Sequence, residues 1–136
     1  MSLPAAAQQV LALLQQSPGF EGRNRALLQL GNQLPSFASE QRNDADLVPG
    51  CDSQVWLRCE HLADTLQFSA SSDARLIRGL LACLLLRANG LTAAELTQVD
   101  WPDWLTQLGL KQQLSPSRAN GLNAVVQRML LLSQAI

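Results

Sequence analysis

The stretch Gln54-Val55-Trp56-Leu57-Arg58-Cys59-Glu60 alternates apolar and polar side chains. Its apolar members recur at every second position, which is typical of a strand with one buried face. A second alternation follows at residues 65–70, where Leu66, Phe68 and Ala70 share one face. The residues between them, 61–64, are therefore expected to form the turn of a β-hairpin.

Helical patterns flank this hairpin on both sides. Apolar spacing, capping residues and Gly or Pro stops predict helices over residues 4–16, 21–34, 93–99, 101–108 and 116–133. A further helix, with Ser72 or Asp73 as its N-cap, is predicted to reach residue 88 and to be the central buried one. Gly31 weakens the second helix relative to alanine. A glycine at this position would be explained either by close packing of two backbones or by an early end of the helix.

The predicted fold is α+β, a single domain over residues 1–136. A small antiparallel sheet of about three strands, with a short edge strand starting at Val48, is packed by helices from both ends of the chain. The connection 35–50 shows no periodicity. A connection of this length in a compact domain is usually functional or mobile.

Composition excludes several classes. The 136 residues are 47% hydrophobic and 15% charged, which argues against disorder, and the net charge of -1 argues against an electrostatic nucleic-acid binder. The longest uncharged apolar stretch, residues 79–86, is far shorter than the roughly 20 residues of a membrane span. The N-terminal residues lack the basic segment of a signal peptide. We therefore expect a cytoplasmic protein with free thiols, and neither a nucleic acid nor a membrane as partner.

The charges are unevenly distributed. Seven of the eleven acidic residues lie between positions 40 and 73, and none follows Asp103. The plain interpretation is a solvated surface; the alternative is that the two halves meet in the fold or face different partners.

The three cysteines differ in their surroundings. Cys83 lies within a leucine-rich helix and Cys59 occupies the apolar register of a strand, so both are interpreted as core residues. Cys51 lies between Pro49-Gly50 and Asp52-Ser53, where a long loop meets the hairpin. Reactive groups tend to sit in such loops, although a structural role for Cys51 remains the alternative. Asp52 is expected to raise the pKa of its thiol.

Metal and hydrolase chemistry have little support. The spacing of Cys51, Cys59 and the lone His61 fits no common zinc site, so no metal is expected. A Cys/His hydrolase would need His61 beside Cys51, whereas His61 is predicted at the hairpin tip. Trp56, on the polar face of its strand, either packs in the core or marks a partner surface, while Trp101 and Trp104 are expected to be packing residues.

Four segments, in order, resemble the SufE family, the sulfur-acceptor partners of cysteine desulfurases. The resemblance covers about residues 20 to 125 and leans toward the CsdE branch. The segments are Leu30-Gly31-Asn32-Gln33-Leu34-Pro35, Gly50-Cys51-Asp52-Ser53-Gln54-Val55-Trp56, Ser72-Asp73 with Arg78-Gly79-Leu80, and Leu114-Ser115-Pro116-Ser117-Arg118-Ala119-Asn120-Gly121-Leu122.

This resemblance implies an accessory sulfur-transfer protein rather than an enzyme. Cys51 would accept a persulfide sulfur from a desulfurase, stimulate that enzyme and relay sulfur to a scaffold that builds iron–sulfur clusters. Pyridoxal phosphate would belong to the desulfurase, so this chain would bind no cofactor. A basic group, from Arg118 or from the partner, is expected to activate the thiol. The implied supporting or partner-contact residues are Gly50, Asp52, Ser53, Trp56, Asp73 and Arg118.

Two alternatives remain open. An independent thiol enzyme, a peroxidase or hydrolase, would turn over without a partner and would need a base beside Cys51. A non-catalytic adaptor would still bind and stimulate the desulfurase after substitution of Cys51.

Overall fold

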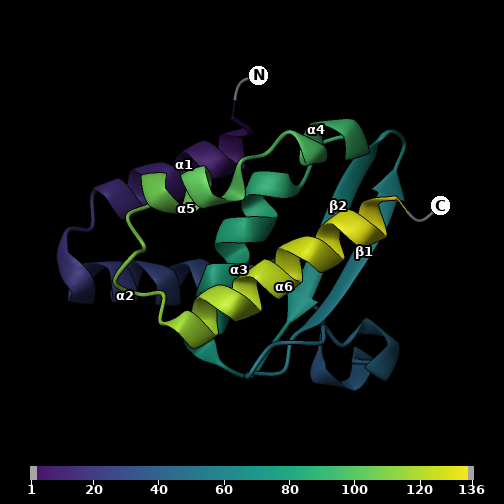
Figure 1. Cartoon of the computed structure of the whole chain (residues 1–136), viewed down its shortest axis with the longest axis horizontal. Helices are drawn as coiled ribbons and strands as arrows, with labels where there is room; N and C mark the ends of the chain where they lie inside the picture. The colour runs from purple at the N-terminus through teal and green to yellow at the C-terminus, as the bar shows by residue number, and fades with distance from the viewer. Residues whose placement is uncertain (1–2, 135–136) are drawn as a thin grey trace.

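A computed structural model describes residues 3–134, which form an α+β fold with helices from both ends of the chain around one antiparallel hairpin (Figure 1). The helices and strands, in chain order, are α1 (Ala5–Gln15), α2 (Gly19–Gly31), β1 (Trp56–Leu62), β2 (Thr65–Ser71), α3 (Arg75–Ala88), α4 (Ala93–Thr97), α5 (Trp101–Gln107) and α6 (Pro116–Ser133). Two short 3-10 helices, η1 (Ser39–Gln41) and η2 (Asp44–Asp46), lie in the connection that precedes the hairpin. The predicted fold class is confirmed.

The hairpin pairs β1 with β2 so that Cys59 lies opposite Phe68. The turn is tighter than predicted, because β1 continues through Leu62 and Ala63 adopts a φ of 54° in the turn. The third strand is reduced to one isolated bridge between Leu47 and Trp56. Beyond this bridge the chain turns away, since proline at 49 has no N–H to donate and the next residue takes a positive φ. Among the described residues, the sheet therefore has two strands rather than about three.

The outer edge of β2 is closed by hydrogen bonds that involve no third strand. The Asn89 side chain accepts from the Phe68 N–H at 2.6 Å and donates to the Phe68 carbonyl at 3.1 Å. On either side, the Leu66 N–H donates to the Leu91 carbonyl and the Ala70 N–H donates to the Pro35 carbonyl. The backbone N–H groups of Leu66, Phe68 and Ala70, which face this edge, therefore all have a hydrogen-bond partner.

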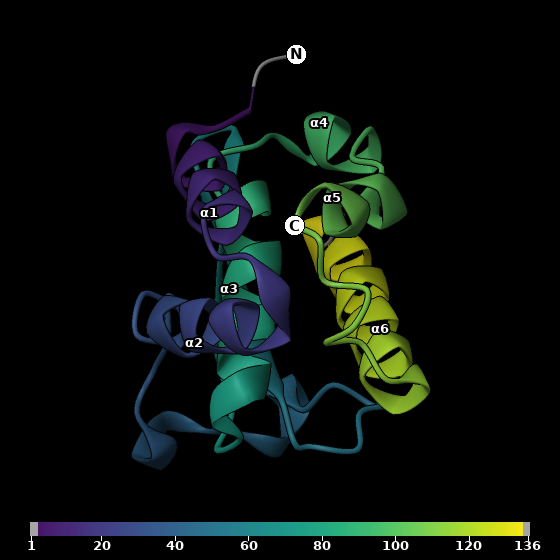
Figure 2. The ribbon, with the colours of Figure 1, turned by 90° about the vertical axis from the view of Figure 1, so that its left-hand side faces the viewer.

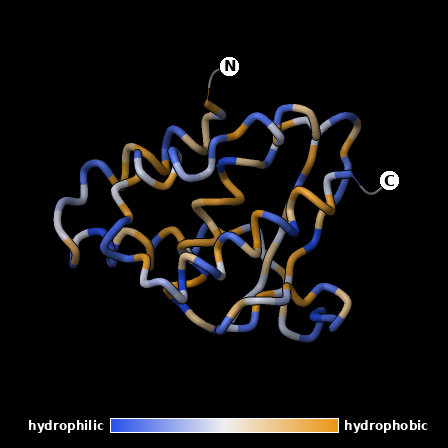
Figure 3. The backbone as a smooth tube through the Cα atoms, viewed as in Figure 1, coloured by the Kyte–Doolittle hydropathy of each residue, from blue (hydrophilic) through white to orange (hydrophobic). Residues whose placement is uncertain are grey.

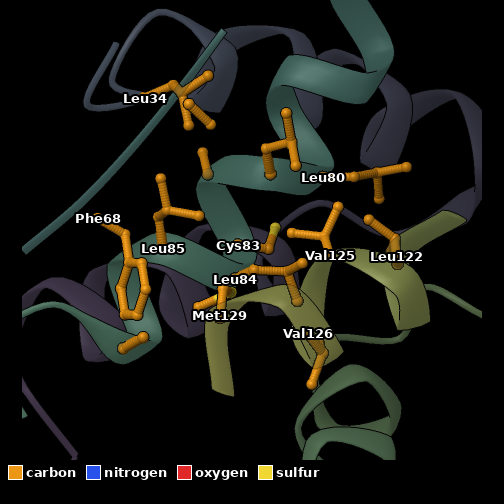
Figure 4. Close-up of a cluster of buried hydrophobic side chains, with 14 of the residues drawn as sticks. Leu34, Phe68, Leu80, Cys83, Leu84, Leu85, Leu122, Val125, Val126 and Met129 are labelled. Atoms are coloured by element: carbon orange, nitrogen blue, oxygen red, sulfur yellow. The ribbon is translucent and has the colours of Figure 1, made fainter. Parts of the chain in front are cut away.

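Helix α3 is the centre of the molecule. Figure 2 shows it between the α1–α2 pair on one side and α6 on the other. Its residues 79–85 are all buried, and the hydropathy-coloured trace is hydrophobic along this inner segment (Figure 3). In the close-up of the core, Cys83 lies among leucines of α3 and faces Val125 and Met129 of α6 (Figure 4). The prediction that α3 is the central buried helix and that Cys83 is a core residue is confirmed.

Helices α2 and α3 cross at two glycines. A Cβ built on Gly79 would lie 2.1 Å from the carbonyl oxygen of Leu27, and one built on Gly31 would lie 3.3 Å from the Gly79 nitrogen. Both explanations offered for Gly31 hold, because α2 also ends at this residue, three residues earlier than predicted. Residues 32–34 continue as a turn of i→i−3 hydrogen bonds, and a residue preceding proline disfavours the helical conformation.

A side-chain cap begins α4, α5 and α6, whereas α1, α2 and α3 have none. Thr92 and Glu95 form a capping box at the start of α4, and the Ser115 hydroxyl caps α6. Helix α3 begins at Arg75, later than predicted, and neither Ser72 nor Asp73 is its N-cap. The Ser72 hydroxyl accepts from the Ala74 N–H in a turn before the helix, while Asp73 binds elsewhere.

The connection 35–50 is folded against the sheet rather than left loose. Arg58 of β1 binds the Asp46 carboxylate at 2.8 Å, donates to the Gln41 carbonyl and stacks on the Phe37 ring at 3.9 Å. One strand residue therefore holds both short 3-10 helices. This packing fixes the chain on the N-terminal side of Cys51.

Candidate functional site

Cys51 lies at the tip of a six-residue loop, residues 49–54. The Val48 N–H donates to the Val55 carbonyl at 2.8 Å and closes the loop at its base. Gly50 has a φ of 88°, a conformation that a residue with a Cβ adopts only at a cost, and it turns Cys51 toward α6. Cys51 thus lies where the connection meets the hairpin, as predicted, but on a short closed loop rather than in a long one.

Helix α6 receives this loop through two residues one turn apart. The Cys51 thiol donates to the Gly121 carbonyl, with 3.5 Å between sulfur and oxygen. The Ser117 hydroxyl donates to the Asp52 carboxylate. Residues four apart share a helix face, so both contacts fall on the same side of α6. A Cβ built on Gly121 would lie 3.8 Å from the sulfur, in ordinary van der Waals contact with it.

Beside the sulfur lies a groove of about 420 Å³ between the loop, α3 and α6. Its wall is mostly apolar, and its charged lining residues are Asp52 and Arg118. Two further lining residues, Ser115 and Ser117, are hydroxyls at the start of α6. The apolar lining residues come from α3, from α6 and from the positions just before β1 and α3; they are Val55, Ala74, Leu76, Ile77, Leu81, Leu122 and Val125.

The surroundings of Cys51 favour its neutral thiol. Partial burial, and after it the Asp52 carboxylate, raise the pKa of the Cys51 thiol above its ordinary value. The predicted direction is confirmed, and burial is the larger cause. Arg118 lines the same groove, but its guanidinium is held by the Gln113 carbonyl at 3.1 Å, and the pKa of Cys51 remains raised.

The structure gathers four of the predicted supporting residues around Cys51 and places two beside them. Asp52, Ser53 and Arg118 line the groove, and Gly50 turns the loop. Trp56 and Asp73 do not line it.

Trp56 and Asp73 both contact Arg42, and each is the chain neighbour of a residue that lines the groove. Arg42 stacks on the Trp56 ring at 4.3 Å and binds the Asp73 carboxylate at 2.9 Å. Its Nε donates to the Ser71 hydroxyl. Trp56 is only 8% exposed, so its core interpretation is correct, although an arginine rather than a helix covers it.

Three contributors were missed by the sequence reasoning. Ser117 and Gly121 belong to a quoted motif, but their spacing of four was the only signal that they share a helix face. Gln113 gave no local signal. It is fully buried. Its side-chain amide donates to the Phe20 carbonyl, and its backbone carbonyl accepts a hydrogen bond from the Arg118 guanidinium. A contact between positions 93 residues apart comes from the tertiary fold alone.

The remaining candidates lie away from the groove. His61 is exposed, and its Nε2 lies 3.2 Å from the Ser133 carbonyl at the end of α6. Gly121 and Ser133 are separated by roughly 18 Å along the helix. Cys59 is half-buried rather than fully buried as predicted, because burial falls along β1 from Trp56 toward the turn.

Over residues 3–134, no three or more His, Cys, Asp or Glu side chains lie close enough together to hold a metal ion. No helix in this range is long and apolar enough to cross a membrane. Trp101 and Trp104 are both buried packing residues, as predicted.

Comparison with known proteins agrees with this architecture. A solution structure of a hypothetical protein from Thermus thermophilus matches the fold with a TM-score of 0.77, covering 98% of this chain and 96% of that one at 18% identity. A SufE-like protein of Rhizobium meliloti is 38% identical over 114 residues, 81% of each chain. The sulfur acceptor protein CsdE of Escherichia coli is 36% identical over 118 residues, which cover 86% of this chain and 80% of CsdE.

The family model for SufE, described as a domain associated with Fe–S metabolism, matches residues 8–132. This match spans the hairpin, the Cys51 loop and all of α3 and α6 except the last residue of α6. The chain belongs to the SufE family.

Proposed function

We propose that this protein accepts sulfur on Cys51 from the persulfide of a pyridoxal-phosphate-dependent cysteine desulfurase, stimulates that enzyme and passes the sulfur on for iron–sulfur cluster assembly in the cytoplasm. The observation that carries the proposal is the position of Cys51. It lies on a short loop, held by polar contacts, beside a largely apolar groove. The membership of the chain in a family associated with Fe–S metabolism supports the same function.

The transfer step exchanges one sulfur atom. The Cys51 thiolate attacks the outer sulfur of the donor persulfide, and a new S–S bond forms. The bond between the donor's two sulfurs breaks, and the inner sulfur leaves as the donor's thiolate. No electron acceptor is needed, because the sulfur atom moves at its own oxidation level. The product is a persulfide on Cys51, and this chain requires no cofactor of its own for the step.

The nucleophile must be ionised for this attack, whereas the free protein favours the thiol. Asp52 contributes to keeping the resting sulfur neutral. A cation must therefore offset the Asp52 charge when the partner binds. We assign this role to Arg118 or to a basic group of the desulfurase. Gly50 and Ser53 would allow the loop to move. Asp73 would belong to a docking surface next to the groove, and the buried Trp56 would support that surface through Arg42.

The alternative of an independent thiol enzyme has weaker support. A peroxidase or hydrolase needs a base or a cation that activates its cysteine. His61 contacts the opposite end of α6, and the surroundings of Cys51 raise rather than lower its pKa. These features suit a thiol that becomes reactive only in a complex.

A transfer assay tests the proposal. The reduced protein is incubated with a cysteine desulfurase and cysteine, and the modified peptide is mapped by intact mass and fragmentation. We expect one added sulfur on Cys51. The Cys59→Ser variant is the matched control and should still be loaded, whereas Cys51→Ser should not.

The same variants separate the alternatives. If Cys51→Ser stimulates the desulfurase as well as the unchanged protein does, the chain is an adaptor. If no desulfurase loads Cys51, or if the protein turns over a peroxide or ester alone, the carrier function is wrong.

A further inference from the structure

The contact that holds the Cys51 sulfur depends on its proton. The partner of the sulfur is the Gly121 carbonyl, and a carbonyl oxygen only accepts hydrogen bonds. A thiol can donate to it, but a sulfur without a proton would place its negative charge 3.5 Å from an oxygen that also carries negative charge. The observed arrangement is therefore specific for the protonated state.

The charged groups around the sulfur act in the same direction. Asp52 is adjacent in the chain, and its carboxylate is fixed by the Ser117 hydroxyl, so it cannot swing away while the loop is seated. Arg118 is the cationic side chain at the groove, and its guanidinium is engaged with the Gln113 carbonyl. The net result is a raised pKa of the Cys51 thiol in the seated loop.

We propose that the loop keeps Cys51 in the groove only while its sulfur is neutral, and that the negative charge of a newly formed persulfide releases the loop from α6. This proposal rests on the proposed function, since it concerns the sulfur-loaded form. A persulfide is a stronger acid than a thiol, because its charge resides on a sulfur bonded to another sulfur. Loading at neutral pH therefore replaces a neutral donor with an anion that has no donor hydrogen for Gly121.

Charge rather than size is the trigger. The groove of about 420 Å³ has room for an added sulfur, and Gly121 presents no side chain against Cys51. A neutral group of similar size should leave the loop seated. The release would then be a property of the carrier itself. The loop would hold an unloaded thiol against α6 and expose a loaded sulfur to the acceptor.

Two isosteric adducts of Cys51 test the proposal. In a Cys59→Ala background, iodoacetamide gives an uncharged carbamidomethyl group and iodoacetate gives a carboxymethyl group of nearly the same size that is anionic at pH 7. Hydrogen exchange is then followed over residues 47–56 and 114–125. We expect the anionic adduct to exchange about tenfold faster than the neutral adduct in both segments, which corresponds to about 1.4 kcal/mol of loop-opening free energy. Neither adduct carries the thiol hydrogen that bonds to Gly121, so the difference between the two reports the charge alone, and the neutral adduct should be the slower to exchange.

Two variants sharpen the result. Asp52→Asn removes one of the negative charges that face the sulfur, so the difference between the adducts should shrink. Ser117→Ala loosens the loop whatever the charge on Cys51, and should speed exchange of both adducts together. Equal exchange of the two adducts in the Cys59→Ala protein, whether both fast or both slow, would overturn the proposal. No desulfurase is present in this experiment, so its outcome is independent of the sulfur-transfer assay.

Discussion

The crossing of α2 and α3 gives a sharp test of the structure, through the substitution Gly79→Ala. A Cβ at this position would lie 2.1 Å from the carbonyl oxygen of Leu27 and 2.6 Å from its carbonyl carbon. Ordinary contact for a Cβ begins near 3.4 Å, so the Leu27 carbonyl must retreat by more than about 1 Å. Because this carbonyl belongs to the backbone of α2, the whole helix must shift.

The expected loss of stability follows from two opposing effects. Alanine is a better helix former than glycine by about 1 kcal/mol in the interior of α3. Forcing extra volume into a packed core costs about 1–3 kcal/mol, and contact with backbone atoms favours the upper end of this range. We therefore expect the free energy of unfolding to fall by about 2 kcal/mol.

Urea denaturation followed by circular dichroism measures this change. Gly22→Ala in α2 is the matched control, because its new Cβ would meet the Ser17 backbone at 3.4 Å, an ordinary contact. That variant should be as stable as the parent or gain up to about 1 kcal/mol. If Gly79→Ala proves as stable as Gly22→Ala, the close α2–α3 crossing described above is wrong.

Three further predictions concern the pKa values of the Cys83 and Cys51 thiols and the contact of Arg42 with the Trp56 ring. Burial raises the pKa of the Cys83 thiol from 9.0 to about 12, so the protein should lose about 4 kcal/mol of stability as the pH rises from 9 toward 12, with none lost below pH 9. Urea midpoints should show this loss. Cys83→Ala should remove most of it, and the raised pKa values of the Cys51 and Cys59 thiols account for the remainder. Asp52→Asn should lower the pKa of the Cys51 thiol and speed its alkylation by iodoacetamide at pH 7–8; an unchanged pH profile would contradict the electrostatic role of Asp52. Arg42→Ala should uncover Trp56, red-shift its fluorescence and cost about 1–2 kcal/mol, whereas unchanged emission would mean that Arg42 does not cover the ring.

Much of the fold is local enough to be predicted from the sequence. The alternation at residues 54–60 and 65–70, the capping box at Thr92 and the Ser115-Pro116 start of α6 are each decided within a few residues. The N-cap of α3 was missed for a tertiary reason. Asp73 is a good cap in isolation, but Arg42, far away in the chain, binds its carboxylate.

The residues of the site also divide into those that could be predicted from neighbouring sequence and those that are brought together by the tertiary fold. Cys51, Gly50 and Asp52 are neighbours in the chain, so their juxtaposition could be predicted. The contacts to Gly121 and the burial that dominates the pKa of Cys51 depend on α6 folding back across 70 residues. The sequence contains no periodicity or cap that reports such a contact. The burial of Trp56 also depends on the tertiary fold, because Arg42, in the connection that precedes the hairpin, covers its ring.

The closed edge of β2 has a consequence for solubility. A two-stranded hairpin with a free edge can recruit strands from other molecules and begin to aggregate. Here the Asn89 amide occupies the place of a neighbouring peptide group on Phe68, so an incoming strand finds the central donor and acceptor already taken. A single side chain thereby closes the β2 edge of this small sheet, and that edge cannot act as a template for fibres.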